Sequence, residues 1–492
     1  MLFIILVIVL SSVLLYLSLR PNNYWKSRNI KQVDDIMVKF IFNKHSLPEI
    51  CKDICDKHED DTIGTSSGAT KNLLLKNPQD IQAVLTGDFQ SFHSRGFLLN
   101  PNDLLGDNLL FMNDFQKWKM TRQKLTPIFT SSRLKNMFYI VDKCARDFVE
   151  LVENNPKMRK NPYNLVYTYT TASIGASMFG IDTQAKSTMD SPFVDMAWKA
   201  SEPTRIGNTL LFLAAVYPNV FKLLKLKVFG QFEKFFIGAI KSVLQSRKID
   251  NDMQTKRQDF IEICSQLKKQ GKMQDLITGF ELDPSDELIA AQAFFFFVAG
   301  ADTSANVMQF TLIELASNPK VLEKLHKEID EVFTAEAEGL TYDNIEKLQY
   351  LDMVVNEATR KYPPIGIIQR LCTRDSVLPS GVSVEKDVIC MIPVLQVQRD
   401  EKNYPNPEVF DPERFSPENI ANVKKYTFLP FGEGNRNCIG GRFARLQVKA
   451  GLARLLRRFT LTPQELKPMV YEKSTFGLRS PDVYYELKPR NM

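Results

Sequence analysis

The longest apolar helical pattern in the chain runs from Pro284 to Ser317 and restricts the folds open to it. At 1.5 Å per residue this helix would be about 51 Å long. Asp283 is a suitable N-cap, and Asn318–Pro319 is a stop signal. The middle of the segment is apolar on every side, so we expect it to be buried. Apolar residues make up 44% of the chain, which allows a core large enough to bury it.

Three residues in this apolar middle are unusual for a buried helix: Gly300, Asp302 and Thr303. Gly300 costs about 1 kcal/mol relative to Ala, and it permits close approach or a local opening. Thr303 can divert a backbone hydrogen bond and bend the helix. A kinked core helix is one explanation. The other is a functional groove in which Asp302 and Thr303 relay protons, with Ala299 and Phe295 on the face of Thr303.

A glycine-rich segment near the C-terminus, Phe431–Gly440, delivers Cys438 to the start of a predicted helix at Gly441–Phe459. Unpaired N–H groups and the helix dipole predict a low pKa for a thiol there. The thiolate is a soft ligand of the kind that binds haem iron; the alternative is a buried structural cysteine. The spacing Phe-x-x-Gly-x-x-x-Cys-x-Gly, with Arg436 two residues before the Cys, resembles the haem-ligand loop of cytochromes P450.

The resemblance covers nearly the whole chain, because four further motifs occur in the order of that family. They are Trp118-x-x-x-Arg122, Ala299-Gly-Ala-Asp-Thr303, Glu357-x-x-Arg360 and Pro412-Glu-Arg-Phe415. It implies the cytochrome P450 fold, a triangular helical prism that is mainly α with small β-sheets and has a long central helix over the haem. It also implies thiolate-ligated haem b, with Cys438 as the axial ligand of the iron. Asp302 and Thr303 would then deliver protons that let the O–O bond of dioxygen break.

The resemblance further implies which side chains contact the haem. Trp118 and Arg122 lie four apart on one helix face and can donate together to a carboxylate, although such a pair alone is usually a surface stripe. Phe431 would shield the sulfur, and Gly434 and Gly440 would let the backbone turn. The residues expected at the cofactor are Arg95, Trp118, Arg122, Ala299, Gly300, Arg370, Phe431, Arg436, Cys438 and Gly440, with the arginines and Trp118 at the propionates.

Glu357 and Arg360 form an E-x-x-R pattern that occurs by chance in most chains of this length. It gains weight from Arg414, which lies in an irregular Pro/Asn-rich segment at 404–416. An arginine from that coil, bonded to the Glu–Arg pair, would pin the segment under the haem loop. The family has this structural network, and breaking one partner of a buried network typically costs about 3–5 kcal/mol.

The substrate cavity is predicted less sharply than the haem site. Four consecutive Phe residues at 294–297 point in every direction, so one or two of them at most can contact substrate. The turn at Ser474–Leu478 resembles the family's hairpin tip that reaches into the cavity. The residues expected there are Phe97, Phe295, Ala299, Ile365, Ile368 and Phe476.

The first residues of the chain predict its location. Leu2–Leu19 holds no charge and would form a helix of about 27 Å, close to the ~30 Å hydrocarbon core. A cleaved signal peptide is the alternative. Basic residues follow directly, so we expect residues 1–20 to be an uncleaved transmembrane anchor and residues 21–492 a cytosolic catalytic domain at the endoplasmic reticulum membrane. Tyr24 and Trp25 are expected at the membrane interface. The proline-rich hinge and the aromatic residues expected in the first sheet, at 62–68, are both missing.

Two other segments allow two interpretations each. Leu210–Gly230, with lysines among leucines, either lies on the membrane surface or is a loop packed on the core. Cys51, Cys55 and His58 have the residue types of a zinc site at a non-standard spacing, and an ordinary amphipathic helix is favoured.

The sequence also limits the partners. A charge of 63 minus 57, or +6, is too weak to argue for nucleic acid. Seven cysteines without a regular frame suit a reduced compartment. There is neither a complete G-x-G-x-x-G nor a P-loop, so electrons must come from another protein. The resemblance implies NADPH–cytochrome P450 reductase, with cytochrome b5 as a further partner. A basic docking face would include Lys117, Lys119, Lys124, Lys424, Lys425, Arg445 and Lys449, unless these residues are merely solvated.

The chain is most similar to insect microsomal members that oxidise plant toxins, insecticides and other lipophilic foreign compounds. The predicted function is a membrane-anchored monooxygenase that inserts one atom of dioxygen into small lipophilic substrates. Two alternatives remain open: a haem-thiolate isomerase or dehydratase that needs no reductase, and a non-catalytic haem protein that senses ligands.

Overall fold

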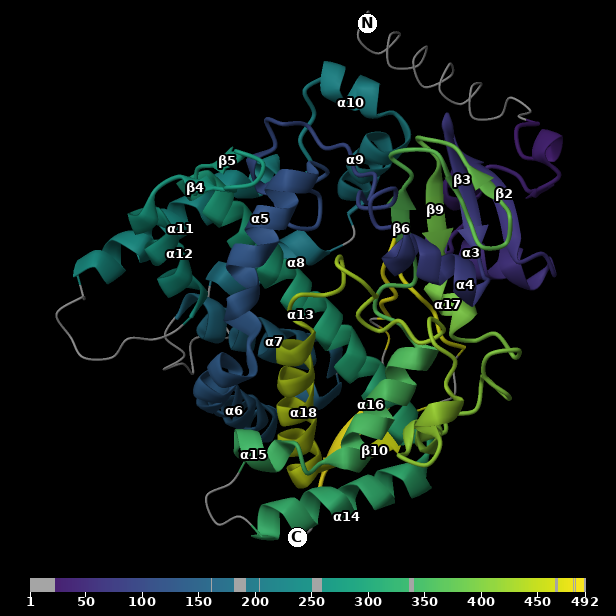
Figure 1. Ribbon diagram of the computed structural model, residues 1–492. Coiled ribbons are helices and arrows are strands. Elements are labelled where there is room, and N and C mark those ends of the chain that lie inside the picture. The colour runs from purple at the N-terminus through teal and green to yellow at the C-terminus, as the bar shows by residue number, and fades with distance from the viewer. Residues whose placement is uncertain are drawn as a thin grey trace, which may run out of the picture.

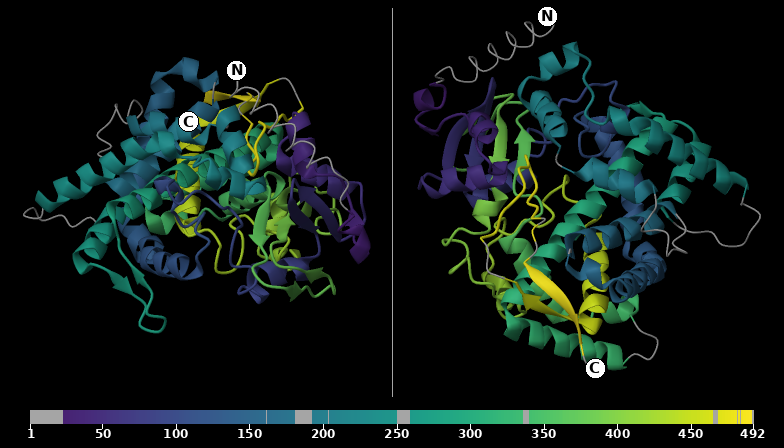
Figure 2. Two further views of the ribbon diagram at one scale, coloured as in Figure 1. Left: turned by 90° about the horizontal axis from the view of Figure 1, so that it is seen from above. Right: turned by 180° about the vertical axis from the view of Figure 1, so that it is seen from behind.

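The protein is described here by a computed structural model that covers residues 23–160, 162–180, 192–202, 204–249, 259–335, 340–464, 468–480, 482 and 484–490. This part of the chain is mainly helical with small sheets, as predicted. The main sheet lies to one side of a larger helical body, and the smaller sheets lie elsewhere on it (Figures 1 and 2). The predicted anchor at residues 1–20 lies outside the described residues.

The central helix α13 spans Asp286–Ser317 and is the element around which the helical body packs (Figure 1). It begins two residues later than predicted, because Ser285 and not Asp283 is the N-cap. The Ser285 Oγ accepts a hydrogen bond from the Leu288 N–H at 3.1 Å, and two acidic residues follow in the first turn. Among the described residues α13 alone is long and apolar enough to cross a membrane, and its apolar middle is instead buried in the protein.

Close packing explains the glycine in α13. A Cβ on Gly300 would lie 2.9 Å from the Cδ1 of Ile174, on helix α7 (Pro162–Phe179), so only glycine lets these two helices approach. Thr303 donates its hydroxyl to the Ala299 carbonyl at 2.7 Å, as expected of a threonine that diverts a backbone bond. The helix nevertheless continues through Thr303 without interruption, so a break at this position is not observed.

Several of the remaining helices pack around α13, and others lie beside the main sheet (Figures 1 and 2). Those that pack directly on α13 include α8 (Pro192–Ser201), α11 (Gly230–Ile249), α14 (Pro319–Ala335), α16 (Gln349–Lys361) and α18 (Gly441–Arg458). The others are α2 (Ile36–Phe42), α3 (Leu47–Asp56), α4 (Pro78–Gln82), α5 (Phe115–Leu125), α6 (Ser131–Asn154), α9 (Arg205–Val216), α10 (Pro218–Leu223), α12 (Phe260–Gln270), α15 (Tyr342–Ile345) and α17 (Val394–Val397).

The main sheet has the strand order β1-β2-β3-β9-β6. Its strands are β1 (Lys31–Gln32), β2 (Thr62–Ser67), β3 (Thr70–Leu75), β9 (Ile389–Ile392) and β6 (Ile368–Leu371). The β2–β3 and β6–β9 pairs are antiparallel, whereas β3 and β9 are parallel, so the N-terminal hairpin joins strands from late in the chain. Three two-stranded sheets are formed by β4 (Met273–Gln274) with β5 (Glu281–Leu282), β7 (Ser376–Val377) with β8 (Ser383–Val384), and β10 (Phe459–Pro463) with β11 (Tyr485–Pro489).

Trp25 corrects the prediction that it lies at a membrane interface. Its side chain is only 2% exposed and its Nε1–H donates to the Thr65 carbonyl at 2.8 Å. The ring occupies the space over Gly64 of β2, where a Cβ would lie 2.1 Å from the Trp25 Cγ. Trp25 thereby supplies the aromatic surface that the strand sequence itself lacks.

The two ambiguous segments are both helical. Within 210–230, α9 and α10 bury Ala214 and Phe221, while Leu223 and Leu224 stay exposed, so one face packs on the protein and another is open. The amphipathic interpretation of Cys51 and Cys55 is confirmed, because α3 buries both. The described residues contain no group of three or more His, Cys, Asp or Glu side chains that could hold a metal ion.

Candidate active site

The loop before α18 turns at two glycines whose backbone angles other residues rarely adopt. Gly432 and Gly434 have φ angles of +66° and +73°, in the left-handed region that favours glycine. A Cβ on Gly434 would also lie 2.1 Å from the Leu85 carbonyl oxygen. The Cys438 N–H donates to the Phe431 carbonyl at 2.8 Å and closes the loop. Cys438 is thus presented two residues before Gly440, the N-cap of α18.

The Cys438 thiol keeps accessible surface although protein surrounds it on nearly all sides. The prediction that its pKa is low is wrong. Burial raises the pKa of Cys438 above its ordinary value and outweighs the Gly440 N–H, Arg122 and Arg95, which lower it. Gly440 has a φ of −95°, so its contribution is this N–H and not a left-handed turn.

Helix α5 is fastened to the Cys438 loop by the predicted Trp–Arg pair. Arg122 donates from Nη1 to the Asn437 carbonyl and from Nη2 to the Asn437 Oδ1, both at 2.8 Å. The Trp118 ring lies under the Arg436 guanidinium, 4.3 Å from its Cζ. On the other side of the loop, the Phe431 ring lies against Gly441 and under Arg445.

The Arg436 guanidinium, predicted to lie at a propionate, is also bonded to three backbone carbonyls. Its Nε, Nη1 and Nη2 donate to the carbonyls of His93, Leu109 and Met112, at 2.9, 3.2 and 2.7 Å. Arg436 therefore clamps the segment 93–112 against the loop. Its spacing from Cys438 in the sequence does not reveal this contact.

Arg95, Arg370 and Arg436 form a buried cationic cluster. Burial lowers the pKa of Arg95 to about 10, of Arg370 to about 9 and of Arg436 to about 8. Repulsion from neighbouring arginines adds to each shift: Arg122 acts on Arg95, Arg95 acts on Arg370, and all three of these act on Arg436. The Arg370 Nε is buried without a hydrogen-bond partner. No carboxylate within the described residues pairs with any of the three. Such a cluster fits an anionic ligand with carboxylate groups.

One face of α13 is not fully covered by the surrounding protein. Phe295, Ala299, Asp302 and Thr303 keep accessible surface in a stretch where most neighbouring residues are buried. The Asp302 carboxylate accepts from the Tyr163 hydroxyl at 3.2 Å and from the Asn306 amide at 3.2 Å. Burial raises the pKa of Asp302, although Arg479 and these two hydrogen bonds oppose the shift. Asp302 therefore retains its proton at a higher pH than an ordinary aspartate.

Three of the predicted substrate-contacting residues lie together. The Phe97 and Phe476 rings are 5.2 Å apart in an edge-to-face arrangement, and Ile365 pairs with Gly477 beside them. Ile368 is elsewhere: its Cδ1 lies 3.7 Å from where a Cβ on Gly432 would stand, so it borders the Cys438 loop. Gly300, expected at the haem, instead packs on Ile174 of α7.

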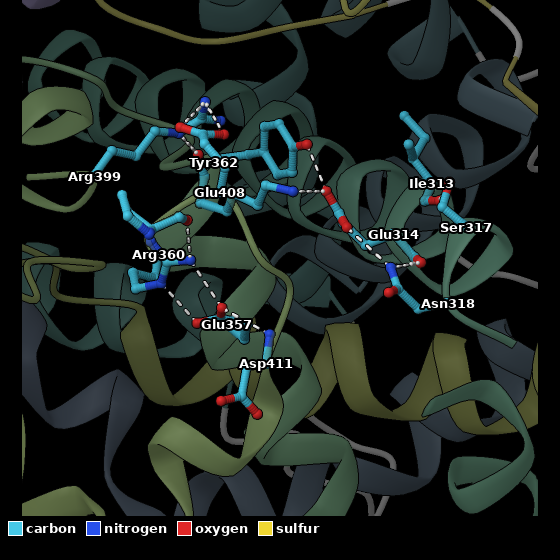
Figure 3. A network of polar contacts seen from close by, with 12 residues as sticks. Ile313, Glu314, Ser317, Asn318, Glu357, Arg360, Tyr362, Arg399, Glu408 and Asp411 are labelled. Carbon is cyan, nitrogen blue, oxygen red and sulfur yellow. Dashed lines mark hydrogen bonds and ion pairs between the residues drawn. The ribbon is translucent and has the colours of Figure 1, made fainter. Parts of the chain in front are cut away.

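The predicted Glu–Arg–Arg network is present and wholly buried at its centre (Figure 3). Arg360 donates from Nε and Nη2 to the two Glu357 oxygens, at 2.7 and 2.8 Å. The Arg414 Nε lies 3.4 Å from Glu357, and the Asp411 N–H donates to the same carboxylate at 3.0 Å. The coil around η8 (Pro412–Phe415) is thus tied to α16.

Comparison with known proteins decides the family. The sequence model of the cytochrome P450 family matches residues 36–487. The chain belongs to the cytochrome P450 family of monooxygenases. Cytochrome P450 6a2 of Drosophila melanogaster is 32% identical over 96% of this chain and 97% of its own. Cytochrome P450 6B7 of Helicoverpa armigera is 31% identical over 94% and 92%, and cytochrome P450 6k1 of Blattella germanica is 32% identical over 96% and 93%.

The cofactor of cytochromes P450 is a haem bound through a thiolate, and the residues of this site fit it. The buried arginines lack counter-charges, which the two propionates of a haem would supply. The Cys438 thiol keeps accessible surface, and a bound iron would favour its thiolate form over the neutral form that burial favours. The fit explains why three guanidinium groups are buried so close together.

Sequence reasoning missed two further members of the polar network. Gln398 donates to the Thr359 and Arg360 carbonyls and accepts from the Leu429 N–H, so it joins α16 to the segment leading to the Cys438 loop. Glu314 of α13 accepts from the Tyr362 hydroxyl at 2.5 Å and the Lys361 ammonium at 2.7 Å (Figure 3). Glutamines within the apolar run Val394–Gln398 were the available signal for the first.

Lys449, one of the residues predicted for the docking face, is buried and cannot contact a partner there. It is 3% exposed, and its Nζ is 2.6 Å from the Asp352 carboxylate. Lys117 is also paired, with Asp107. Lys124 and Lys425 are exposed, as a docking residue must be.

Proposed function

We propose that this cytochrome P450 is a membrane-anchored haem-thiolate monooxygenase that acts on small lipophilic foreign compounds, such as plant toxins or insecticides. Electrons come from NADPH through NADPH–cytochrome P450 reductase at the endoplasmic reticulum membrane, with cytochrome b5 as a further partner. The observation that carries the proposal is the accessible Cys438 thiol beside an uncompensated arginine cluster. Helix α18, which follows it, packs on α13, the helix of Asp302 and Thr303.

The bound haem supplies an iron centre that activates dioxygen. Cys438 Sγ would ligate the iron, and Arg95, Arg122 and Arg370 would hold the propionates with Trp118 and Arg436 behind them. The fixed loop geometry at Gly432 and Gly434 would keep the sulfur in place. Phe431, packed under Arg445, would screen the sulfur side from water.

Asp302 and Thr303 would handle the protons. The raised pKa of Asp302 lets its carboxyl hold a proton inside the protein. The Thr303 hydroxyl now donates to the Ala299 carbonyl and would turn towards the cavity to pass a proton on. The presence of Asp302 and Thr303 at these positions argues against the two alternatives, since neither an isomerase nor a ligand sensor needs a proton route.

Apolar surfaces support a lipophilic substrate and a membrane contact. Phe97, Ile365 and Phe476 would bind apolar molecules and exclude water. On the outside, Phe42 of α2 and Leu223 of α10 are largely exposed, and these two helices border the same hydrophobic cluster. Substrate dissolved in the bilayer would meet this surface first.

The test is turnover of candidate toxins with purified reductase, NADPH and ¹⁸O₂. We expect a product that carries one atom from the labelled gas, formed only with reductase. Product formed from a peroxide without NADPH would instead support the isomerase, and binding spectra without any product would support the sensor.

Thr303→Ala should leave haem binding intact and lower the product formed per NADPH several-fold, with the missing electrons recovered as hydrogen peroxide. The reason is loss of the hydroxyl that passes the proton. Thr311→Ala is the matched control, because Thr311 lies on the same helix and makes the same bond to a carbonyl four residues earlier. Equal coupling in the Thr303 and Thr311 variants would contradict the relay.

Arg370→Leu should have opposite effects on the haem-free and the haem-bound protein. Removing one of three uncompensated buried charges should raise the melting temperature of the haem-free chain. The same change should speed haem loss to apomyoglobin by about tenfold, because one propionate partner is gone. Arg374→Leu, at an exposed position near the same strand, should change neither. A raised melting temperature of the haem-free chain without faster haem loss would place the haem carboxylates elsewhere.

A further inference from the structure

The hairpin of β4 and β5 ends in two apolar side chains that face water. Leu276 and Ile277 are each 93% exposed, which makes them the most exposed large apolar residues in the described chain. The hairpin projects from the body of the molecule, as the left view of Figure 2 shows. Aliphatic side chains so fully in water are a recognised mark of a binding surface when they occur side by side.

Hydrogen bonds within the turn fix the backbone that carries these two side chains. The Asp275 carboxylate accepts from the Ile277 and Thr278 N–H groups at 2.9 and 3.0 Å. The Asp275 N–H donates to the Phe280 carbonyl at 2.9 Å, and Gly279 supplies the left-handed turn with φ +68°. A preformed tip loses little conformational entropy on binding.

The tip lies next to the helix that holds the Cys438 loop. The Lys119 Nζ of α5 is 3.9 Å from the Asp275 carboxylate, and Arg122 of the same helix bonds to Asn437. Figure 1 shows β4 and β5 beside α5. Lys119 of α5 and Lys272 at the base of the hairpin pair with the carboxylates of Asp275 and Glu281, whereas Lys124 of α5 is exposed.

We propose that Leu276 and Ile277 are the apolar anchor with which this protein binds its electron-donating flavoprotein. The inference rests on the proposed function, which requires such a partner on the Cys438 side. An apolar contact beside a helix that carries the exposed Lys124 matches a partner surface that combines apolar and acidic groups. Lys124 would speed and orient the encounter, while the anchor would set how long the complex lasts.

The test compares three variants of the full-length haem protein in detergent, with the dissociation constant for purified NADPH–cytochrome P450 reductase as the readout. L276S/I277S should bind about tenfold more weakly at both low and high salt, because apolar contacts are not screened. K124A should bind more weakly only at low salt. V377S, on the β7–β8 hairpin that bonds to Asp80 and Asp88, removes a side chain that is 67% exposed and should bind as the wild type does.

The carbon monoxide spectrum after chemical reduction by dithionite should be identical in all variants, which shows an intact haem site. Unchanged reductase affinity of L276S/I277S would overturn the anchor while leaving the proposed function standing. Unchanged reductase affinity with lost binding to phosphatidylcholine vesicles would overturn it in favour of a membrane contact. A wild-type chain that does not bind the reductase at all would refute the proposed electron source, and the anchor with it.

Discussion

Cys438→Ser should abolish the strongly red-shifted Soret band of the reduced carbon monoxide complex, together with all NADPH-dependent product. A serine hydroxyl is a hard, weakly acidic group and cannot replace a thiolate as electron donor to iron. The loop should still fold, because the closing bond to Phe431 uses the backbone N–H of residue 438. The effect is therefore on the metal and not on the fold.

Cys372→Ser is the matched control for this experiment. Cys372 is buried and its Sγ donates to the Arg374 carbonyl, a bond that a serine hydroxyl can also make. We expect this variant to keep the red-shifted band and the activity. A red-shifted band that persisted in Cys438→Ser would show that another residue ligates the iron.

Glu357→Ala should give a protein that is recovered largely without haem or aggregated. The substitution leaves the Arg360 guanidinium, which has no exposed surface, without its counter-charge. Such a loss costs about 3–5 kcal/mol, out of a typical total stability of about 5–15 kcal/mol. It also frees the Asp411 N–H and releases the coil that Arg414 ties down. Denaturant unfolding followed by circular dichroism measures the change.

Glu413→Ala tests whether the effect belongs to the network. Glu413 lies two residues from Asp411 and pairs with Lys324 at 2.6 Å on the surface. An exposed pair of this kind contributes about 0–1 kcal/mol, so this variant should fold and bind haem normally. A well-folded Glu357→Ala haem protein, as stable as Glu413→Ala, would show that the coil holds itself.

Several contacts of the site could be predicted because the residues that form them lie only three or four positions apart on one helix. Glu357 and Arg360 are one helical turn apart, and Thr303 bonds to a carbonyl four residues before it, so both contacts follow from helix geometry. The glycine at 434 is likewise required locally by a left-handed turn. The central helix was predicted to within two residues because its apolar pattern is long.

The errors concern properties that only the folded chain creates. The pKa of Cys438 depends on burial, which outweighs the local helix end. Arg436 is occupied by three carbonyls more than 320 positions away in sequence, and no local pattern indicates them. Lys449 is charged and on a basic helix, yet the fold turns it towards Asp352. Trp25 follows an apolar segment and looks interfacial until β2 provides a glycine for it to cover.

The burial of Trp25 has a mechanical consequence. The Trp25 ring is bonded to Thr65 of β2, and the hydroxyl of the neighbouring Tyr24 donates to Glu385 at 2.6 Å. Anything attached ahead of residue 23 must therefore leave from one fixed point beside the sheet. The folded body would then be held close to that point and could not drift freely away from it. The tilt of the folded body relative to that attachment would be restricted. The main sheet would therefore stay on the side of the attachment from one turnover to the next.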